Sequence, residues 1–117
     1  MDLLACLTTG KGTWGHVSRL IAEKDWDTIY LITNDFGKEN FTASKKANMV
    51  LVDARRGTEE LRDDIMNQLK GFLKGTEVAV NLASGTGKEH MALIAAMLQL
   101  GFGVRFVALT KDGVKEI

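Results

Sequence analysis

The amino-acid sequence predicts an α/β fold, a three-layer sandwich with a mainly parallel sheet of five strands or slightly more. Short apolar runs alternate along the chain with longer amphipathic segments, which is the pattern of strands alternating with helices. The short runs are continuously apolar, so we expect both of their faces to be buried. A length of 117 residues suits one domain, and we assign residues 1–117 to it.

Apolar runs and helical stripes place the elements in order. The expected strands cover residues 3–7, 29–32, 49–52, 78–80 and 104–109. A first helix is indicated by four apolar residues at helical spacing, namely Trp14, Val17, Leu20 and Ile21. A second helix follows from the stripe Leu61, Ile65, Leu69, Phe72 and Leu73. We expect Thr58 to cap this second helix, with Glu59 and Glu60 in its first turn.

The third helix is expected over residues 88–100, where residues 91–98 are apolar on every face. Such a helix is either wedged between neighbouring elements or forms a subunit interface, and both readings remain open here. Residues 34–48 show the weakest pattern in the chain. They are consistent with a short helix around residues 41–47 or with a mobile loop.

Composition excludes several classes of protein. Fifteen basic and fifteen acidic residues give a net charge of zero, which argues against a surface that coats nucleic acid. The longest apolar run is far shorter than the roughly 18 residues of a membrane span, and residues 1–7 do not form a secretory signal. We expect a cytoplasmic protein with no membrane contact. Cys6 reads as a small buried hydrophobe, and two distant histidines make a poor metal site, so no metal and no cofactor are expected.

Candidate binding residues follow the expected strands, because ligands of open parallel sheets bind beyond the carboxyl ends of the strands. Two glycine-rich loops, one after the first expected strand and one after the fourth, lie on this one edge together with four cations. This arrangement predicts an anionic, phosphate-bearing ligand. The competing interpretation is a set of ordinary strand–helix turns with solvated lysines. The ligand-binding candidates are Thr8, Thr9, Gly10, Lys11, Gly12, Thr13, Trp14, Asn34, Asp35, Arg55, Asn81, Ser84, Gly85, Thr86, Gly87 and Lys88.

Two familiar phosphate motifs are considered for these loops. Gly10, Gly12 and Gly15 satisfy the dinucleotide pattern G-x-G-x-x-G, with Asp35 as the acid after the second strand. Lys11 is bulky for a loop that must approach a pyrophosphate closely, which argues against this reading. A nicotinamide- or nucleotide-binding enzyme domain is therefore kept only as an alternative. A P-loop is excluded at the second loop, because it lacks the required first glycine and the magnesium-binding hydroxyl.

The second loop also reads as a helix start. Thr86 and Glu89 have the spacing of a capping box. Lys88 then falls in the first turn, where the helix dipole disfavours a cation unless an anion is bound nearby. Trp14 is either a hydrophobic staple at the start of its helix or a platform on which a base stacks. The sequence shows no nucleophile–base arrangement, and His16 and His90 are expected to be surface or half-buried residues rather than acid–base groups.

Taken together, these features resemble the CRISPR-associated Rossmann-fold (CARF) sensor domains. Their loop after the fourth strand follows the pattern Asn-x-Thr-Gly-Gly-Thr-Lys-x-Met. Asn81, Gly85 and Thr86 fall in register with this pattern. Ala83 and Ser84 replace its first threonine and first glycine, and Gly87 stands at the lysine position. Lys88 comes one residue late, and Met91 follows it by three residues rather than two.

The resemblance implies a Rossmann-like sandwich that forms a homodimer and binds a cyclic oligoadenylate, a second messenger of antiviral defence, across the dimer. Some such domains also cleave the ring without a metal, by attack of a ribose 2′-hydroxyl on the adjacent phosphate. Lys88, Lys11 and Ser84 are the candidates for that chemistry here, although pure binding is the favoured prediction. The ligand-sensing domain of a transcription regulator is a further alternative, and no direct DNA binding is expected from this domain.

Overall fold

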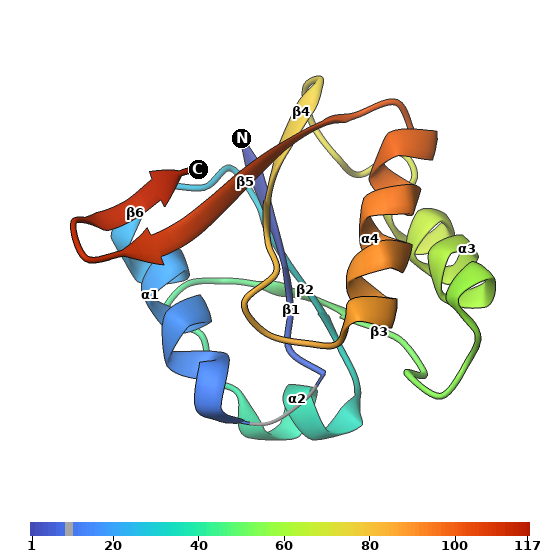
Figure 1. The fold of residues 1–117 in the computed structure, drawn as a ribbon, viewed down its shortest axis with the longest axis horizontal. Helices are drawn as coiled ribbons and strands as arrows, with labels where there is room; N and C mark the ends of the chain where they lie inside the picture. The colour runs from blue at the N-terminus through green and yellow to red at the C-terminus, as the bar shows by residue number, and fades with distance from the viewer. Residues whose placement is uncertain (9–10) are drawn as a thin grey trace.

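The computed structural model describes residues 1–8 and 11–117, with the backbone alone at Lys11 (Figure 1). Strands and helices alternate along almost the whole chain, as the sequence predicts. In chain order the elements are β1 (Asp2–Cys6), the 3₁₀ turn η1 (Lys11–Thr13), α1 (Trp14–Glu23), β2 (Ile29–Thr33), α2 (Asp35–Asn40), β3 (Asn48–Leu51), α3 (Thr58–Leu69), β4 (Glu77–Asn81), α4 (Gly87–Gln99), β5 (Gly103–Thr110) and β6 (Gly113–Glu116).

The strands form one six-stranded sheet in the order β3-β2-β1-β4-β5-β6. Strands β1 to β5 pair in parallel, and β6 pairs antiparallel with β5. This confirms the predicted α/β fold with a mainly parallel sheet. The sixth strand belongs to a tight hairpin in which Thr110 pairs with Gly113. The Asp112–Gly113 dipeptide is the sequence signal of such a turn, since Gly113 adopts a φ of 102°.

Helices pack on both faces of this sheet (Figure 1). Leu3, Ala5 and Leu7 join a core cluster with α1, whereas Leu4 and Cys6 join a second cluster with α3 and α4. All five residues of β1 are buried. The burial explains why this strand reads as a continuous apolar run.

The helices largely follow the predicted stripes. Helix α1 buries Trp14 and the three other residues of its stripe. Helix α3 begins at Thr58, but Gly57 occupies the cap position without a side-chain hydrogen bond, so the expected Thr58 cap is wrong. The helix ends at Leu69, before Gly71 at a φ of 84°, and Phe72 is therefore not part of its buried stripe.

Helix α4 spans Gly87–Gln99, within one residue of the prediction at each end. Its C-terminus forms a Schellman motif. The Phe102 amide donates to the Met97 carbonyl at 3.0 Å, and the Gly101 amide donates to the Leu98 carbonyl at 3.1 Å. Gly101 takes a φ of 88°, which stops the helix and turns the chain into β5.

The segment between β2 and β3 differs from the prediction. A helix, α2, forms at Asp35–Asn40, whereas residues 41–47 are irregular, so the expected helix at 41–47 is wrong. Two local features explain the earlier start. The Asn34 side chain caps α2 by accepting the Gly37 amide at 3.0 Å. Gly37 packs so tightly that a Cβ would lie 1.8 Å from the Thr33 hydroxyl oxygen and 2.7 Å from the Leu7 carbonyl oxygen.

Among the described residues, no helix has both the length and the apolar character needed to cross a lipid bilayer.

Candidate functional site

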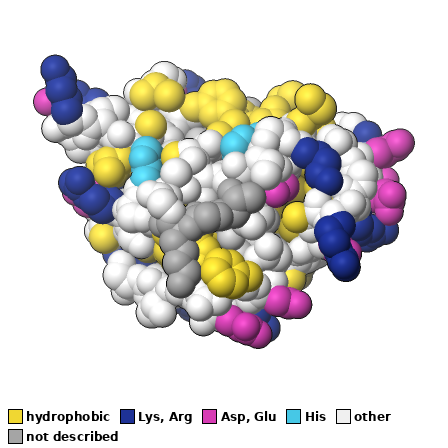
Figure 2. Space-filling model, turned by 60° about the horizontal axis from the view of Figure 1, so that its bottom comes forward, with side chains coloured by type: hydrophobic (Ala, Val, Ile, Leu, Met, Phe, Trp, Pro, Cys, Tyr) yellow, Lys and Arg dark blue, Asp and Glu magenta, His cyan; other side chains and the backbone are white. Residues whose placement is uncertain are grey.

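The described residues that follow β1 and the loop after β4 lie at one edge of the sheet, seen at the bottom of Figure 1 and facing the viewer in Figure 2. Strands β1 and β4 are neighbours, yet the chain passes from β1 to β2 on one side and from β4 to β5 on the other. Open α/β sheets bind ligands at such a position. Thr8 and the predicted site residues of the loop after β4 therefore belong to one candidate site.

Gly85 brings the loop after β4 down onto the end of β1. A Cβ at this position would lie 2.9 Å from the Cys6 Cβ, and 3.2 Å from both the Glu89 carboxylate and the His90 ring. Gly85 also has a φ of 96°, which side chains other than glycine's rarely adopt. Two independent constraints thus require glycine here.

Asn81 anchors the same loop from within the sheet. Its side-chain amide donates to the Val107 carbonyl at 2.8 Å and to His16 Nε2 at 3.0 Å. Its side-chain oxygen accepts the Ala83 amide at 3.1 Å. Asn81 is 3% exposed, so its hydrogen-bonding groups are committed to the fold rather than presented to a ligand.

Thr86 and Glu89 form the predicted helix start. The Thr86 hydroxyl accepts the Glu89 amide at 3.5 Å and donates to Glu89 Oε1 at 3.0 Å. Glu89 therefore reaches back to the Thr86 hydroxyl, in a variant of the capping box. Because the Thr86 hydroxyl donates one hydrogen bond to Glu89 and accepts another from it, Thr86 acts in the structure as a helix cap.

Lys88 lies in the first turn of α4, as predicted, and extends to the loop after β3. Its ammonium donates to the Arg56 carbonyl at 2.7 Å. A carbonyl is a neutral acceptor that takes one of the three ammonium protons, so the positive charge stays available to an anion. Lys88 is half-buried, and Gly87 beside it is exposed.

Two hydroxyls at this edge are buried without a hydrogen-bond partner in the described part of the chain. They are Thr8 Oγ1 and Ser84 Oγ, in residues that are 7% and 1% exposed. A buried hydroxyl without a partner costs stability, so such groups point to a missing acceptor or donor. They lie after β1 and β4 respectively, which are neighbouring strands of the sheet.

The residues after β2 and β3 lie at the same edge, next to the first loop. The side-chain amide of Asn34 donates to the Thr8 carbonyl at 3.2 Å, which ties the start of α2 to the end of β1. Arg55 grips Asp53 with two hydrogen bonds of 3.0 Å. These bonds lower the pKa of the exposed Asp53 carboxyl to about 2. Asp35 is exposed beside them.

In the first loop, Thr9 and Gly10 lie outside the described residues, as does the side chain of Lys11. Gly12, Thr13 and Gly15 are exposed. A Cβ at Gly12 or Gly15 would meet no atom within 4 Å. In the dinucleotide pattern the third glycine allows close packing of helix on strand, and Gly15 has no such neighbour. This geometry disfavours the nicotinamide alternative.

Trp14 is 7% exposed and packs its ring against two phenylalanines. The ring centroids lie 5.7 Å from Phe41, edge to face, and 5.8 Å from Phe36. Burial on this scale leaves no open ring face for a base, so the packing favours an anchoring role at the start of α1.

His16 has a structural role that the sequence does not reveal. Its Nε2 accepts the Leu109 amide at 3.1 Å as well as the Asn81 side chain. Because a backbone amide can only donate, Nε2 carries no proton and the ring proton sits on Nδ1. Burial lowers the pKa of His16 below its ordinary value, in agreement with a neutral ring.

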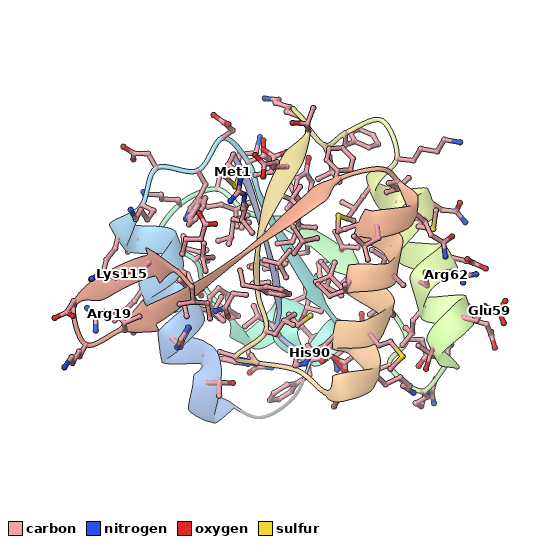
Figure 3. The ribbon with its side chains drawn as sticks, turned by 45° about the horizontal axis from the view of Figure 1, so that its top comes forward. Met1, Arg19, Glu59, Arg62, His90 and Lys115 are labelled. Carbon is pink, nitrogen blue, oxygen red and sulfur yellow. The ribbon has the colours of Figure 1, made fainter. Side chains whose placement is uncertain are left out.

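Two further side chains hold the second loop. His90, at the start of α4 in Figure 3, contacts the Ser84 carbonyl through Nε2 at 2.7 Å and therefore carries its proton there. Cys6 is fully buried beneath Gly85, as predicted. Burial, and then the nearby Glu89 carboxylate, raise the pKa of the thiol to about 12. Cys6 is thus an inert core residue.

The outer face of α4 is apolar and open. Met91 and Leu98 are 65% and 60% exposed, so this helix is not wedged between neighbours within one chain. Together with exposed residues near the end of the chain it forms an apolar patch, part of the band of hydrophobic side chains near both histidines in Figure 2. The patch consists of Leu82, Met91, Ile94, Leu98, Phe106 and Ile117.

The described residues contain no group of three or more histidines, cysteines and carboxylates arranged to hold a metal ion. Comparison with protein-family models finds no match to this chain, and comparison with curated proteins finds none either. Function therefore rests on the geometry of the sheet edge at which β1 and β4 end.

Proposed function

We propose that this chain is a sensor domain that binds a cyclic oligoadenylate at the carboxyl edge of its sheet. The proposal takes the fold to be a three-layer Rossmann-like sandwich of the CARF type. The observation that carries it is the pair of buried hydroxyls, Thr8 Oγ1 and Ser84 Oγ, without partners in the described part of the chain. Thr8 follows β1 and Ser84 precedes α4, so a phosphate bound where these neighbouring strands end would supply the acceptor that both hydroxyls lack.

The charge at this edge supports a phosphate. The ammonium of Lys88 retains free protons beside the N-terminus of a 13-residue helix. Gly87, the first residue of that helix, has an amide with no acceptor inside the helix and no side chain to obstruct a ligand. A phosphate seated there would offset both the helix dipole and the lysine charge.

The cyclic oligoadenylate is the more specific part of the proposal. It is supported by the form of the loop after β4, in which Asn81, Gly85 and Thr86 match the family pattern. The structure gives these three residues the task of shaping the loop, through the hydrogen bonds of Asn81, the tight fit of Gly85 and the cap of Thr86. The comparison with the family thus rests on the sequence of a loop whose matched residues have structural tasks in this chain.

The apolar patch supports a homodimer as the binding unit. An exposed continuous patch of large apolar side chains is typical of an interaction surface. Leu82 and Ala83 of the loop after β4 line the pocket that contributes Phe106 and Ile117 to the patch, so a second chain docked on the patch would adjoin this loop. Light scattering at micromolar concentration should report about twice the chain mass. A soluble monomer would overturn the shared site.

Binding without cleavage is the favoured activity, because the described contacts force no side chain into a catalytic role. If the ring is cleaved, the ribose 2′-hydroxyl attacks the adjacent phosphate, and Lys88 stabilises the growing negative charge. Lys11 and Ser84 are the other candidates for that role. Analysis of the products in the presence of a chelator separates binding from metal-independent cleavage.

The deciding experiment is a calorimetric titration with cyclic oligoadenylates of several ring sizes, with linear oligoadenylates and a nicotinamide dinucleotide as controls. Lys88→Ala removes a charge-assisted contact worth about 1.5–3 kcal/mol and should weaken binding roughly ten- to over a hundredfold. Lys70→Ala, at the exposed far end of α3, is the matched control and should bind as the parent does. A folded Lys11→Ala/Lys88→Ala variant with unchanged affinity would rule the proposal out.

A further inference from the structure

Glu89 is a buried carboxylate that the proposed phosphate site does not use. It lies in the first turn of α4 and is 2% exposed. It forms no ion pair within the described part of the chain. A charged group that is buried without an opposite charge is costly, so its hydrogen-bond partners decide whether it is stable there.

The two oxygens of this carboxylate are in different situations. Oε1 accepts the Thr86 hydroxyl at 3.0 Å, whereas Oε2 is buried and has no partner in the described part of the chain. A Cβ on Gly85 would lie 3.2 Å from Oε2 and 2.9 Å from the Cys6 Cβ. Oε2 therefore lies beneath the loop after β4, close to the end of β1. A carboxylate oxygen only accepts hydrogen bonds, so the group missing beside it is a donor.

A phosphate does not supply this donor. The unpartnered hydroxyls of Thr8 and Ser84 can donate to phosphate oxygens. A phosphodiester, however, carries no proton at neutral pH, and its negative charge repels a carboxylate. The edge of the sheet thus needs two different ligand groups, an acceptor for the two hydroxyls and a donor for Glu89.

A cyclic oligoadenylate carries only two kinds of donor, the ribose 2′-hydroxyl and the 6-amino group of adenine. The 2′-hydroxyl is on the carbon next to the one that bears the 3′-phosphate, whereas the amine is at the far side of the base. Ser84 directly precedes Gly85, the residue that lies over Oε2. The donor is therefore needed close to the phosphate, which favours the 2′-hydroxyl.

We infer that Glu89 Oε2 accepts the ribose 2′-hydroxyl of the ligand, next to the phosphate that Ser84 binds, and so selects ribonucleotides over deoxyribonucleotides. The inference rests on the proposed function for the identity of the ligand. Because Oε2 is enclosed beneath the half-buried Gly85, the hydroxyl reaches it when the loop shifts at this residue. The Gly85 amide therefore reports the contact.

The test compares adenosine 3′-monophosphate with its 2′-deoxy and 2′-deoxy-2′-fluoro analogues. Each is titrated into the full chain at about pH 8 with EDTA and followed by amide-resolved NMR. The ribose compound should bind roughly ten- to over a hundredfold more tightly than both analogues, as expected for a hydrogen bond to a charged acceptor. It alone should shift the Gly85 amide. Equal affinities, or no binding of the ribose compound at millimolar concentration, would overturn the inference.

Glu89→Gln provides the second arm. The variant keeps an oxygen to accept the Thr86 hydroxyl and replaces Oε2 by a nitrogen that cannot accept a hydrogen bond. Its preference for ribose should fall several-fold, and an unchanged preference in the folded variant would contradict the inference. Glu59→Gln is the matched control, in the first turn of α3, with a side chain that is 82% exposed and points away from α4 in Figure 3. If Glu89→Gln fails to fold, the three nucleotides still decide the question on the parent.

The outcomes separate this inference from the proposed function. A preference for ribose without any binding of cyclic oligoadenylate would support the role of Glu89 and overturn the cyclic ligand. Tight binding of the ring that is unchanged when fluorine replaces its 2′-hydroxyls would overturn the role of Glu89 and leave the sensor proposal standing. Binding that needs Mg²⁺ and does not distinguish the sugars would assign Oε2 to a cation, which also overturns the inference.

Discussion

The two glycine-rich loops at the binding edge look alike in sequence and differ in how they use glycine. In the loop after β4, Gly85 lies against the Cβ of Cys6 and has a φ of 96°. In the segment after β1, Gly12 and Gly15 have open space where a side chain would lie. Glycine is thus a structural requirement at Gly85, whereas Gly12 and Gly15, like Gly87 beside the crowded loop, have room for a side chain. Crowding, rather than the number of glycines, marks the loop that shapes the site.

The largest effect is expected at the crowded loop. Gly85→Ala combines backbone strain with a collision against the core, and each of these typically costs about 1–3 kcal/mol. The free energy of unfolding should fall by about 2–5 kcal/mol, measured by urea denaturation.

Cys6 supplies an independent readout of the same change. Its thiol, buried and with its pKa raised to about 12, should resist iodoacetamide at pH 8.5 in the native parent. Gly85→Ala should speed its alkylation by opening the loop above it. A variant as stable as the parent, with an equally protected thiol, would show that the loop has room for a side chain.

The next effect concerns the residue that anchors the crowded loop. Asn81→Ala leaves the Ala83 amide and the Val107 carbonyl without their partners. The free energy of unfolding should fall by about 2–4 kcal/mol, since each unsatisfied buried group costs about 1–3 kcal/mol. Asn81→Asp keeps the acceptor for Ala83 but sets a buried carboxylate oxygen against the Val107 carbonyl oxygen, so it should lose at least as much. A loss of ligand affinity at unchanged stability would instead make Asn81 a ligand contact.

The elements of the fold were largely predictable, because burial on both sheet faces leaves a direct trace in the apolar runs of β1, β2 and β4. Helix α2 was missed because its start depends on a tertiary contact, the fit of Gly37 against Thr33 and the Leu7 carbonyl. The sequence shows a glycine there without showing what lies next to it.

The site was predictable as a location but not as a set of contacts. Strand order and loop composition indicate the edge. However, Asn81, Thr86 and Asn34 were expected to face a ligand, and each has partners within the chain. Polar residues that cap helices or anchor turns are of the same types as those that bind phosphates, so composition does not separate the two roles. His16 likewise required the structure, since its partners come from β4 and β5.

A smaller effect links the two loops through pH. His16, on the helix after the first loop, accepts hydrogen bonds from Asn81 and from the Leu109 amide. Burial lowers its pKa from the ordinary 6.5, so the unfolded chain binds this proton more readily than the folded one. Its contribution to stability is therefore complete above about pH 6.5 and is lost as the pH falls through the lowered value.

Urea denaturation of the parent and of His16→Gln from pH 7.5 to 5 measures this contribution. The free energy of unfolding of the parent, relative to that of His16→Gln, should decrease as the pH is lowered. An NMR titration of the His16 ring gives its pKa directly, and a value at or above 6.5 would contradict the neutral acceptor.

The smallest effect is expected at the open glycine. Gly15 lies in the first turn of α1, where the Cβ added by Gly15→Ala would meet no neighbour within 4 Å. Replacing glycine in a helix by alanine should raise the free energy of unfolding by about 0.5–1 kcal/mol. Thermal and urea denaturation should both show this gain. A marked loss would mean that the first loop is as constrained as the second.

The central place of β1 has a consequence for the order in which the chain folds. Leu3 pairs with Ile29 on one side and with Ala79 on the other. During synthesis the first strand therefore leaves the ribosome early, but one of its hydrogen-bonding edges stays unpaired until β4 has emerged. Contacts so distant along the chain slow folding. Nascent or truncated chains that stop before β4 would expose a long apolar strand edge, and they should aggregate or recruit chaperones.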